Sequence, residues 1–187
     1  MRRQNFLYKY IKGDKFLNVG NAEYGGGYHN DLINRYPEVD FYGLDVAKLD
    51  NVQRQFIGSC EDMPFDDNTF DTVYMGEVIE HVWNPLAAVK EAYRVLKPGG
   101  LYIFDTPNPY SLSRILRYSL KRSDHLGNPD HKIFFSRATI NKLLAIAGFT
   151  LVEFTTENNF STHFFSFNFP TKLFWHFGEC YLVAAKK

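Results

Sequence analysis

The sequence of 187 residues contains little cysteine, no excess of either charge and no long apolar run. Its two cysteines, Cys60 and Cys180, are far apart, which excludes a disulfide framework and the ligand spacing of a zinc site. Lys plus Arg is 21 and Asp plus Glu is 21, so the chain lacks the positive field of a general nucleic-acid-binding protein. No apolar stretch could span a bilayer, and the basic N-terminus has no signal-peptide pattern behind it. We therefore expect a cytoplasmic protein without a membrane span and without general nucleic-acid binding.

Hydrophobic residues make up 45% of the chain, enough for a buried core. Short apolar runs alternate with helical patterns, which predicts one α/β domain over residues 1–187 with a mainly parallel sheet. The predicted strands cover residues 16–20, 40–45, 55–59, 70–75, 101–105, 149–157 and 179–185. Helices are predicted over 29–36, from Pro85 to Leu96 after the cap residue Asn84, and from the cap residue Ser136 to Ala147.

Aromatic residues are concentrated near the C-terminus. Eight of the 20 residues from Asn158 to Phe177 are aromatic. We expect them to fill the core beneath a long crossover rather than to form a surface for a partner.

Four short motifs follow one another between the third and fifth predicted strands. They are Cys60-Glu61-Asp62-Met63-Pro64-Phe65, Asp67-Asn68-Thr69-Phe70-Asp71, Glu77-Val78-Ile79-Glu80-His81-Val82 and Arg94-Val95-Leu96-Lys97-Pro98-Gly99-Gly100. In this order and spacing the chain resembles the class I S-adenosylmethionine-dependent methyltransferases of the small-molecule type. It is similar to the ubiquinone-pathway O-methyltransferases, and the likeness covers about residues 14–157.

The resemblance implies a Rossmann-like α/β fold. Its seven-stranded, mostly parallel sheet would carry helices on both faces and an antiparallel last strand. The implied activity is methyl transfer from S-adenosylmethionine to a small or medium-sized acceptor, which we expect at oxygen. The implied cofactor-binding residues are Gly20, Asn21, Ala22, Asp45, Val46, Glu61, Asp62, Met63, Met75, Gly76 and Glu77.

Each of these residue types suits its expected partner. Small residues after the first strand let the backbone approach the cofactor. The carboxylate of Asp45 only accepts hydrogen bonds, so it can hold two ribose hydroxyls. The resemblance places Asp62 near the adenine amino group, with the backbone N–H and apolar side chain of Met63 against the ring.

The first loop departs from the family's Gly-x-Gly-x-Gly pattern. In Gly20-Asn21-Ala22-Glu23-Tyr24, Ala22 replaces the second glycine and Tyr24 the third. Gly25 to Gly27 could form the tight turn instead. A non-catalytic binding module with a decayed cofactor loop therefore remains an alternative.

A metal site is a further alternative. If a helix begins directly after the fourth strand, Glu77, Glu80 and His81 share a face, and His131 is a candidate fourth ligand. This spacing is similar to that of metal-dependent ubiquinone-pathway methyltransferases and small-RNA 2′-hydroxyl methyltransferases. The alternatives are therefore a divalent ion, with RNA as the acceptor in one case, or His81 or His131 as general base without a metal.

Residues 107–132 form the predicted lid over the acceptor. Basic residues outnumber acidic ones in this segment by 5 − 2 = 3 between Arg114 and Lys132. Arg114, Arg117 and Lys121 can share one helical face. This face could cover an anionic acceptor or simply be solvated.

Overall fold

The computed structural model describes residues 2–22, 27–50, 52–121, 128–157, 159–161, 166–168 and 175–187. Its strands are β1 (Lys15–Val19), β2 (Asp40–Asp45), β3 (Gln55–Ile57), β4 (Phe70–Gly76), β5 (Leu96–Pro107), β6 (Thr150–Thr156), β7 (Asn159–Ser161), β8 (Ser166–Asn168) and β9 (Cys180–Lys186). Its helices are α1 (Arg3–Tyr10), α2 (Gly27–Arg35), α3 (Pro85–Val95), α4 (Leu112–Lys121) and α5 (Arg137–Ala147), with short 3₁₀ helices η2 (Ile79–His81) and η3 (Trp175–Phe177).

Seven strands form one sheet in the order β3-β2-β1-β4-β5-β9-β6. The ladders from β3 to β5 are parallel, whereas β9 is antiparallel to both β5 and β6. This confirms the predicted fold, including the antiparallel last strand. The chain leaves β1 towards β2 on one side and reaches β4 on the other, so the strand order reverses between β1 and β4. Ligands of open α/β sheets bind outside the carboxyl ends of the strands at such a reversal.

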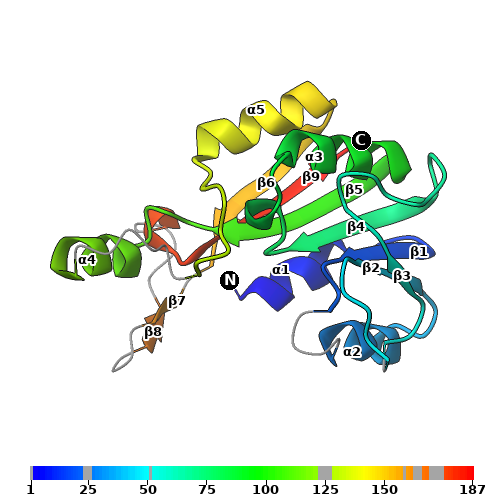
Figure 1. Ribbon diagram of the computed structural model, residues 1–187, viewed down its shortest axis with the longest axis horizontal. Helices are drawn as coiled ribbons and strands as arrows, with labels where there is room; N and C mark the ends of the chain where they lie inside the picture. Colours follow the sequence, from blue (N-terminus) through cyan, green and yellow to red (C-terminus); the bar gives the residue numbers. More distant parts are fainter. Residues whose placement is uncertain are drawn as a thin grey trace.

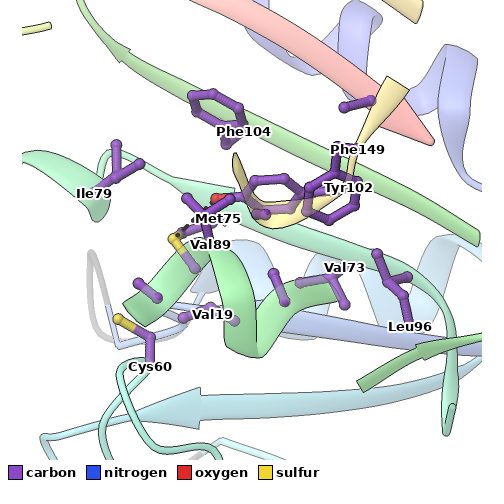
Figure 2. Close-up of a cluster of buried hydrophobic side chains, with 14 of the residues drawn as sticks. Val19, Cys60, Val73, Met75, Ile79, Val89, Leu96, Tyr102, Phe104 and Phe149 are labelled. Atoms are coloured by element: carbon purple, nitrogen blue, oxygen red, sulfur yellow. Dashed lines mark hydrogen bonds between the residues drawn. The ribbon is translucent and has the colours of Figure 1, made fainter. Parts of the chain in front are cut away.

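Helices cover both faces of the sheet (Figure 1). On one face, α3 and α5 pack over a core that contains Val73, Met75 and Tyr102 (Figure 2). On the other face, α1 and α2 enclose a smaller core around Phe6 and Leu32. The central strands are buried on both sides, as expected for strands that lie between two layers of helices.

Two helices begin at the side-chain caps that the sequence predicts. The amide of Ala87 donates to Asn84 Oδ1 over 3.1 Å before α3, and the amide of Thr139 donates to Ser136 Oγ over 3.1 Å before α5. Gly148 ends α5 at φ 101°, a left-handed conformation that glycine adopts at low cost. Local sequence thus fixes where these two helices lie along the chain.

Several elements differ from the prediction. Helix α1 was not predicted, and β5 begins at Leu96 because Leu96 already pairs with Phe70. The aromatic-rich region contains β7 and β8, which form a separate two-stranded sheet beyond the main sheet (Figure 1). Residues 162–165 and 169–174 of this region lie outside the described part. Within the described residues, no helix combines the length and the apolar character needed to cross a membrane.

Candidate functional site at the carboxyl edge of the sheet

Three adjoining hollows open at the carboxyl edge of the sheet, and Gly20 lines all of them. We name each hollow after one residue that lines it. The Trp83 hollow, of about 280 Å³, lies beside the end of β2, and the His131 hollow, of about 420 Å³, lies beside the end of β4. The Arg3 hollow, of about 380 Å³, lies between α1 and α2. The register explains their meeting point, because Val19 pairs with both Leu44 and Met75 and so brings three strand ends together.

Position 20 at the end of β1 requires glycine. Its φ is 76°, and a Cβ placed there would lie 2.3 Å from Cγ2 of Val78. Its amide donates to the carbonyl of Leu44 over 2.8 Å, which ties the loop to β2. The chain can therefore turn tightly at the end of β1 and leave open space above the sheet.

Asp45 ends β2 and lines both the Trp83 and the His131 hollows. Its Oδ2 accepts the amide of Ala22 over 2.9 Å, and its Oδ1 accepts the amide of Ala47 over 2.9 Å. Each carboxylate oxygen can accept a second hydrogen bond. Asp45 therefore shapes the loop and still offers acceptor capacity at the rim of both hollows.

The predicted cofactor residues are only partly brought together. The Trp83 hollow is lined by Gly20, Asp45, Val46 and Glu61, and the His131 hollow also by Ala22, Gly76 and Glu77, while Asn21 lines the Arg3 hollow. Asp62, Met63 and Met75 line none of these three. Tyr24, Gly25 and Gly26 lie outside the described residues.

The expected role of Met63 is wrong in one respect. Its backbone N–H donates to Glu91 Oε2 over 2.8 Å, so it is not available to an adenine ring. Its side chain is buried in the core, as is that of Met75. Contacts with α3 and the core thus engage the Met63 N–H and the Met63 and Met75 side chains, which the sequence analysis assigned to the cofactor.

The predicted metal face is also corrected. Glu77 has φ 48° and precedes η2, so it does not share a helical face with Glu80 and His81. Instead, Glu77 Oε1 pairs with Arg3 Nη2 at 2.6 Å. The residues that do converge are Glu80, His81 and His131, whose ligand atoms lie within 4.8 Å of one another.

Glu80 is buried beneath this cluster. Thr106 Oγ1 donates to its Oε2 over 2.9 Å, and its Oε1 has no hydrogen-bond partner in the described structure. Burial raises the pKa of this carboxyl to about 8. Glu80 is therefore mainly protonated at neutral pH when no cation balances it.

The two histidines of the cluster face each other. The ring of His131 meets that of His81 edge-on, with centroids 4.8 Å apart. The backbone amide of the next residue, Lys132, donates to the carbonyl of Glu80 over 2.8 Å, which holds His131 beside η2. Burial, followed by the nearby His81, lowers the pKa of His131 below its usual value. At neutral pH His131 is therefore a neutral imidazole that can accept a proton.

Comparison with known proteins shows which proteins the chain resembles. A family model described as a methyltransferase domain matches residues 24–104. A probable S-adenosylmethionine-dependent methyltransferase of Mycolicibacterium smegmatis is 30% identical over 163 residues, covering 81% of this chain and 60% of the relative. These matches, together with the fold, support a class I S-adenosylmethionine-dependent methyltransferase.

Further relatives agree with this family. A demethylmenaquinone methyltransferase of Staphylococcus epidermidis is 44% identical over 65 residues, which are 34% of this chain and 27% of that protein. A solved S-adenosylmethionine-dependent methyltransferase from Archaeoglobus fulgidus has a TM-score of 0.74 at 18% identity, covering 99% of this chain and 91% of that one. The chain thus spans less than two thirds of these curated relatives' length, while its fold matches the solved structure almost throughout.

The described residues at the carboxyl edge of the sheet have the chemistry that S-adenosylmethionine would need. Gly20 turns the chain at the end of β1, where a Cβ would clash with Val78, and Asp45 provides acceptors at the rim. Asn21, next to the bend, is buried, and both polar atoms of its amide lack a hydrogen-bond partner among the described residues. These features suit an elongated ligand with hydroxyl and amino-acid groups.

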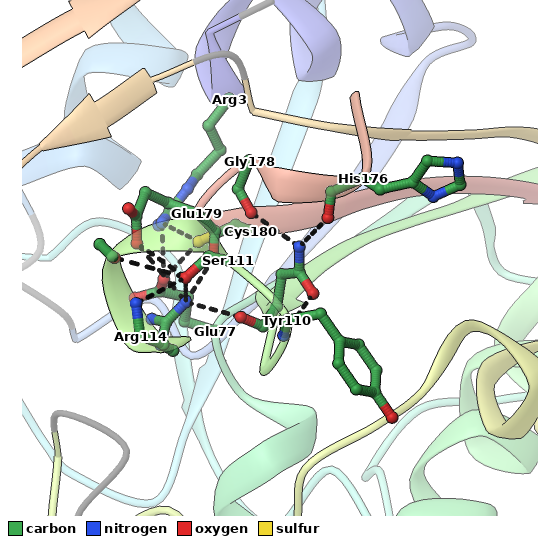
Figure 3. Close-up of polar contacts among 11 residues, drawn as sticks. Arg3, Glu77, Tyr110, Ser111, Arg114, His176, Gly178, Glu179 and Cys180 are labelled. Carbon is green, nitrogen blue, oxygen red and sulfur yellow. Dashed lines mark hydrogen bonds and ion pairs between the residues drawn. The ribbon is translucent and has the colours of Figure 1, made fainter. Parts of the chain in front are cut away.

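A polar network at the ends of β4, β5 and β9 was not predicted (Figure 3). Arg3 of α1 pairs with Glu77 and also, through Nε, with Asp105 Oδ1 at 3.2 Å. The hydroxyl of Tyr74 donates to Asp105 Oδ2 over 2.7 Å. Burial raises the pKa of Asp105 to about 7, against the opposing effect of Arg3. No sequence pattern marked Arg3, because α1 lacks a clear apolar stripe.

The predicted lid contains α4, and residues 122–127 of it lie outside the described part. Arg114, expected on an exposed basic face, instead donates to the carbonyls of Asn108 at 3.0 Å and Glu179 at 2.5 Å (Figure 3). The side-chain Nδ2 of Asn108 donates to the backbone carbonyls of His176 and Gly178, each over 2.8 Å. Arg114 therefore joins the start of α4 to the segment before β9 and is not free to bind an acceptor.

Proposed function

We propose that this chain transfers a methyl group from S-adenosylmethionine to an oxygen atom of a small acceptor. The observation that carries this proposal is the free acceptor capacity of Asp45 beside the Gly20 bend, at the rim of two hollows. When bound, the cofactor supplies a methyl group activated by a sulfonium. The resemblance to the methyltransferase family and the location at the strand reversal both support this site.

The three hollows suggest where each part of the cofactor would bind. Asp45 would accept hydrogen bonds from the ribose hydroxyls, with the adenine ring in the Trp83 hollow. The N-terminus of α2 lines the Arg3 hollow, where its backbone N–H groups would suit a carboxylate. This arrangement would leave the reactive methyl at the His131 hollow, between the other two.

His131 is the proposed general base. An acceptor hydroxyl in the His131 hollow would lose its proton to this imidazole as its oxygen bonds to the methyl carbon and the carbon–sulfur bond breaks. The neutral state of His131 at physiological pH suits that role. Asn128 and His131 line the same hollow, which supports residues 107–132 as the cover of the acceptor site.

Calorimetric titration with S-adenosylmethionine tests the binding half of the proposal. We expect heat of binding with the folded chain and competition by S-adenosylhomocysteine. If the folded chain binds neither compound, the proposal fails and the non-catalytic module replaces it.

Methyl transfer from radiolabelled cofactor to a panel of small phenols tests the catalytic half. We expect His131→Gln to lower kcat about a hundredfold or more, since a positioned base contributes roughly that factor. The exposed His176 provides the control, and His176→Gln should leave turnover unchanged. An unchanged pH profile and rate in His131→Gln would remove His131 from the reaction.

A divalent cation held by Glu80, His81 and His131 is the second candidate, supported by their convergence. Such an ion would lower the pKa of an acceptor hydroxyl and position it. Titration with Mn²⁺ alone should then show one site that Glu80→Gln abolishes. Methyl transfer to short RNA that requires the ion would favour the RNA 2′-hydroxyl alternative, whereas turnover that survives chelation would exclude a required metal.

A further inference from the structure

Lys132, at the end of the predicted lid, fastens this part of the chain to the short helix η2. The backbone amides of Lys132 and Ile133 donate to the carbonyl of Glu80 over 2.8 Å and 3.3 Å. The ammonium of Lys132 donates to the carbonyl of His81, with Nζ 2.7 Å from the oxygen. One short stretch of chain therefore occupies two successive carbonyls of η2.

These two carbonyls need partners from outside the helix. Glu80 and His81 are the last two residues of η2, and the final carbonyls of a helix have no donor within it. The ammonium of Lys132 supplies such a donor, and a positive charge is also favoured at the carbonyl end of a helix. The Lys132 side chain thus has a specific binding position on η2.

Lys132 also lies at the border between two hollows. Its Nζ is 5.4 Å from the centroid of the Trp83 ring, within the range of cation–π attraction. Lys132 and Trp83 both line the Trp83 hollow, whereas the neighbouring His131 lines the His131 hollow. A single peptide bond therefore links the residue beside the proposed adenine site to the proposed base.

The ring of His131 has no hydrogen bond of its own to orient it. Its Nδ1 is buried without a hydrogen-bond partner among the described residues. The ring contacts are edge-on, with centroid distances of 4.8 Å to His81 and 5.6 Å to Phe134. The position of this imidazole therefore depends on how the neighbouring chain is attached to η2.

We propose that Lys132 is a positioning residue for His131. Its ammonium, bound to the carbonyl of His81, keeps the imidazole at the His131 hollow, within reach of an acceptor hydroxyl. This inference rests on the proposed function, in which the imidazole of His131 takes the acceptor proton. Lys132 itself takes no proton and acts only by placing the base, since a base that is displaced from its substrate loses much of its effect on the rate.

A double-mutant cycle tests the proposal. Lys132→Met keeps an unbranched side chain but removes the donor, so kcat for methyl transfer should fall about fivefold to tenfold, the loss of roughly one charged hydrogen bond. The dissociation constant of S-adenosylmethionine should change by less than about twofold. Lys132→Arg keeps a cationic donor and should restore most of the rate. In the His131→Gln background, Lys132→Met should have no further effect, because a residue that acts only through His131 has nothing left to position.

Proton NMR provides a readout that needs no turnover. Lys132→Met should shift the imidazole resonances of His81 and His131, because their rings lie edge-on to one another beside the lost bond. Lys142 on α5 is also exposed, so Lys142→Met is the matched control and should leave these resonances and kcat unchanged.

The outcomes separate this inference from the proposed function. A folded wild-type chain that neither binds S-adenosylmethionine nor transfers its methyl group refutes the proposed function. With an active wild type, an unchanged kcat in Lys132→Met overturns the inference alone, as does an equal loss in the presence and absence of His131. Unshifted histidine resonances in Lys132→Met overturn it whatever the activity.

Discussion

Two regions at the carboxyl edge of the same sheet use their polar groups in opposite ways. Around Gly20 and Asp45, polar groups keep spare hydrogen-bonding capacity beside open hollows. Around Arg3 and Asp105, charged groups are paired with one another and hold α1 against β4 and β5. The comparison teaches that a charged residue at a strand end binds a ligand only if its own neighbours leave it capacity.

Removing Arg3 should have the largest effect on stability. Arg3→Ala leaves Asp105 buried without its ion pair, and we expect a loss of about 3 kcal/mol in the free energy of unfolding. This lies at the low end for breaking a buried pair, because the Arg3 side chain is 28% exposed. Urea denaturation measures the change.

Lys9 on the same helix provides the control for Arg3. It pairs with Glu153 at 2.5 Å, but its side chain is 51% exposed. Lys9→Ala should therefore cost below about 1 kcal/mol. Equal losses in the two variants would show that the Arg3 network does not hold α1 more tightly than a surface pair does.

Removing Asp45 should affect cofactor binding more than global folding. Asp45→Ala should weaken S-adenosylmethionine binding by about 2 kcal/mol, as expected for lost charge-assisted hydrogen bonds. Asp40 lies at the amino end of the same strand, so Asp40→Ala should leave cofactor affinity unchanged. Titration calorimetry on both variants distinguishes the two ends of β2, and unaltered affinity in Asp45→Ala would refute the ribose assignment.

A smaller effect on stability is expected from the pH dependence of Glu80, which can be compared with that of Glu91. Burial raises the pKa of Glu80 from 4.5 to about 8, so the folded state loses stability as pH rises across that interval. Glu80→Gln should remove this loss, and its stability relative to the wild type should rise by roughly 1 kcal/mol per pH unit or less. Thermal or urea unfolding at several pH values, with metal excluded by chelator, measures it.

Glu91 should show the opposite sign. The hydrogen bond from Arg94 lowers its pKa, so its contribution is present above 4.5 and is lost as pH falls through the lowered value. Glu91→Gln should therefore be less stable than the wild type at neutral pH and approach it in acid. A parallel pH response of the two variants would contradict the burial of Glu80.

The motifs predicted the fold because their signals are local. The helix caps at Asn84 and Ser136 depend on neighbours within a few residues. Glu77 was misplaced because its left-handed conformation cannot be foreseen from spacing. The backbone N–H of Met63 was assigned to a ligand, but it donates to Glu91. Glu91 lies on α3, and short motifs do not show that α3 packs against Met63.

The sequence by itself determined the seven strands of the main sheet, the two capped helices and the resemblance to the family, since periodicity, capping and the ordered motifs are contained in short stretches of chain. Only the tertiary structure decided which polar groups remain free. Arg3 meets Asp105 across about a hundred residues of sequence, and Arg114 meets the carbonyl of Glu179. Such pairings depend on how distant elements pack, and they use hydrogen-bonding capacity that the linear motif alone would leave to a ligand.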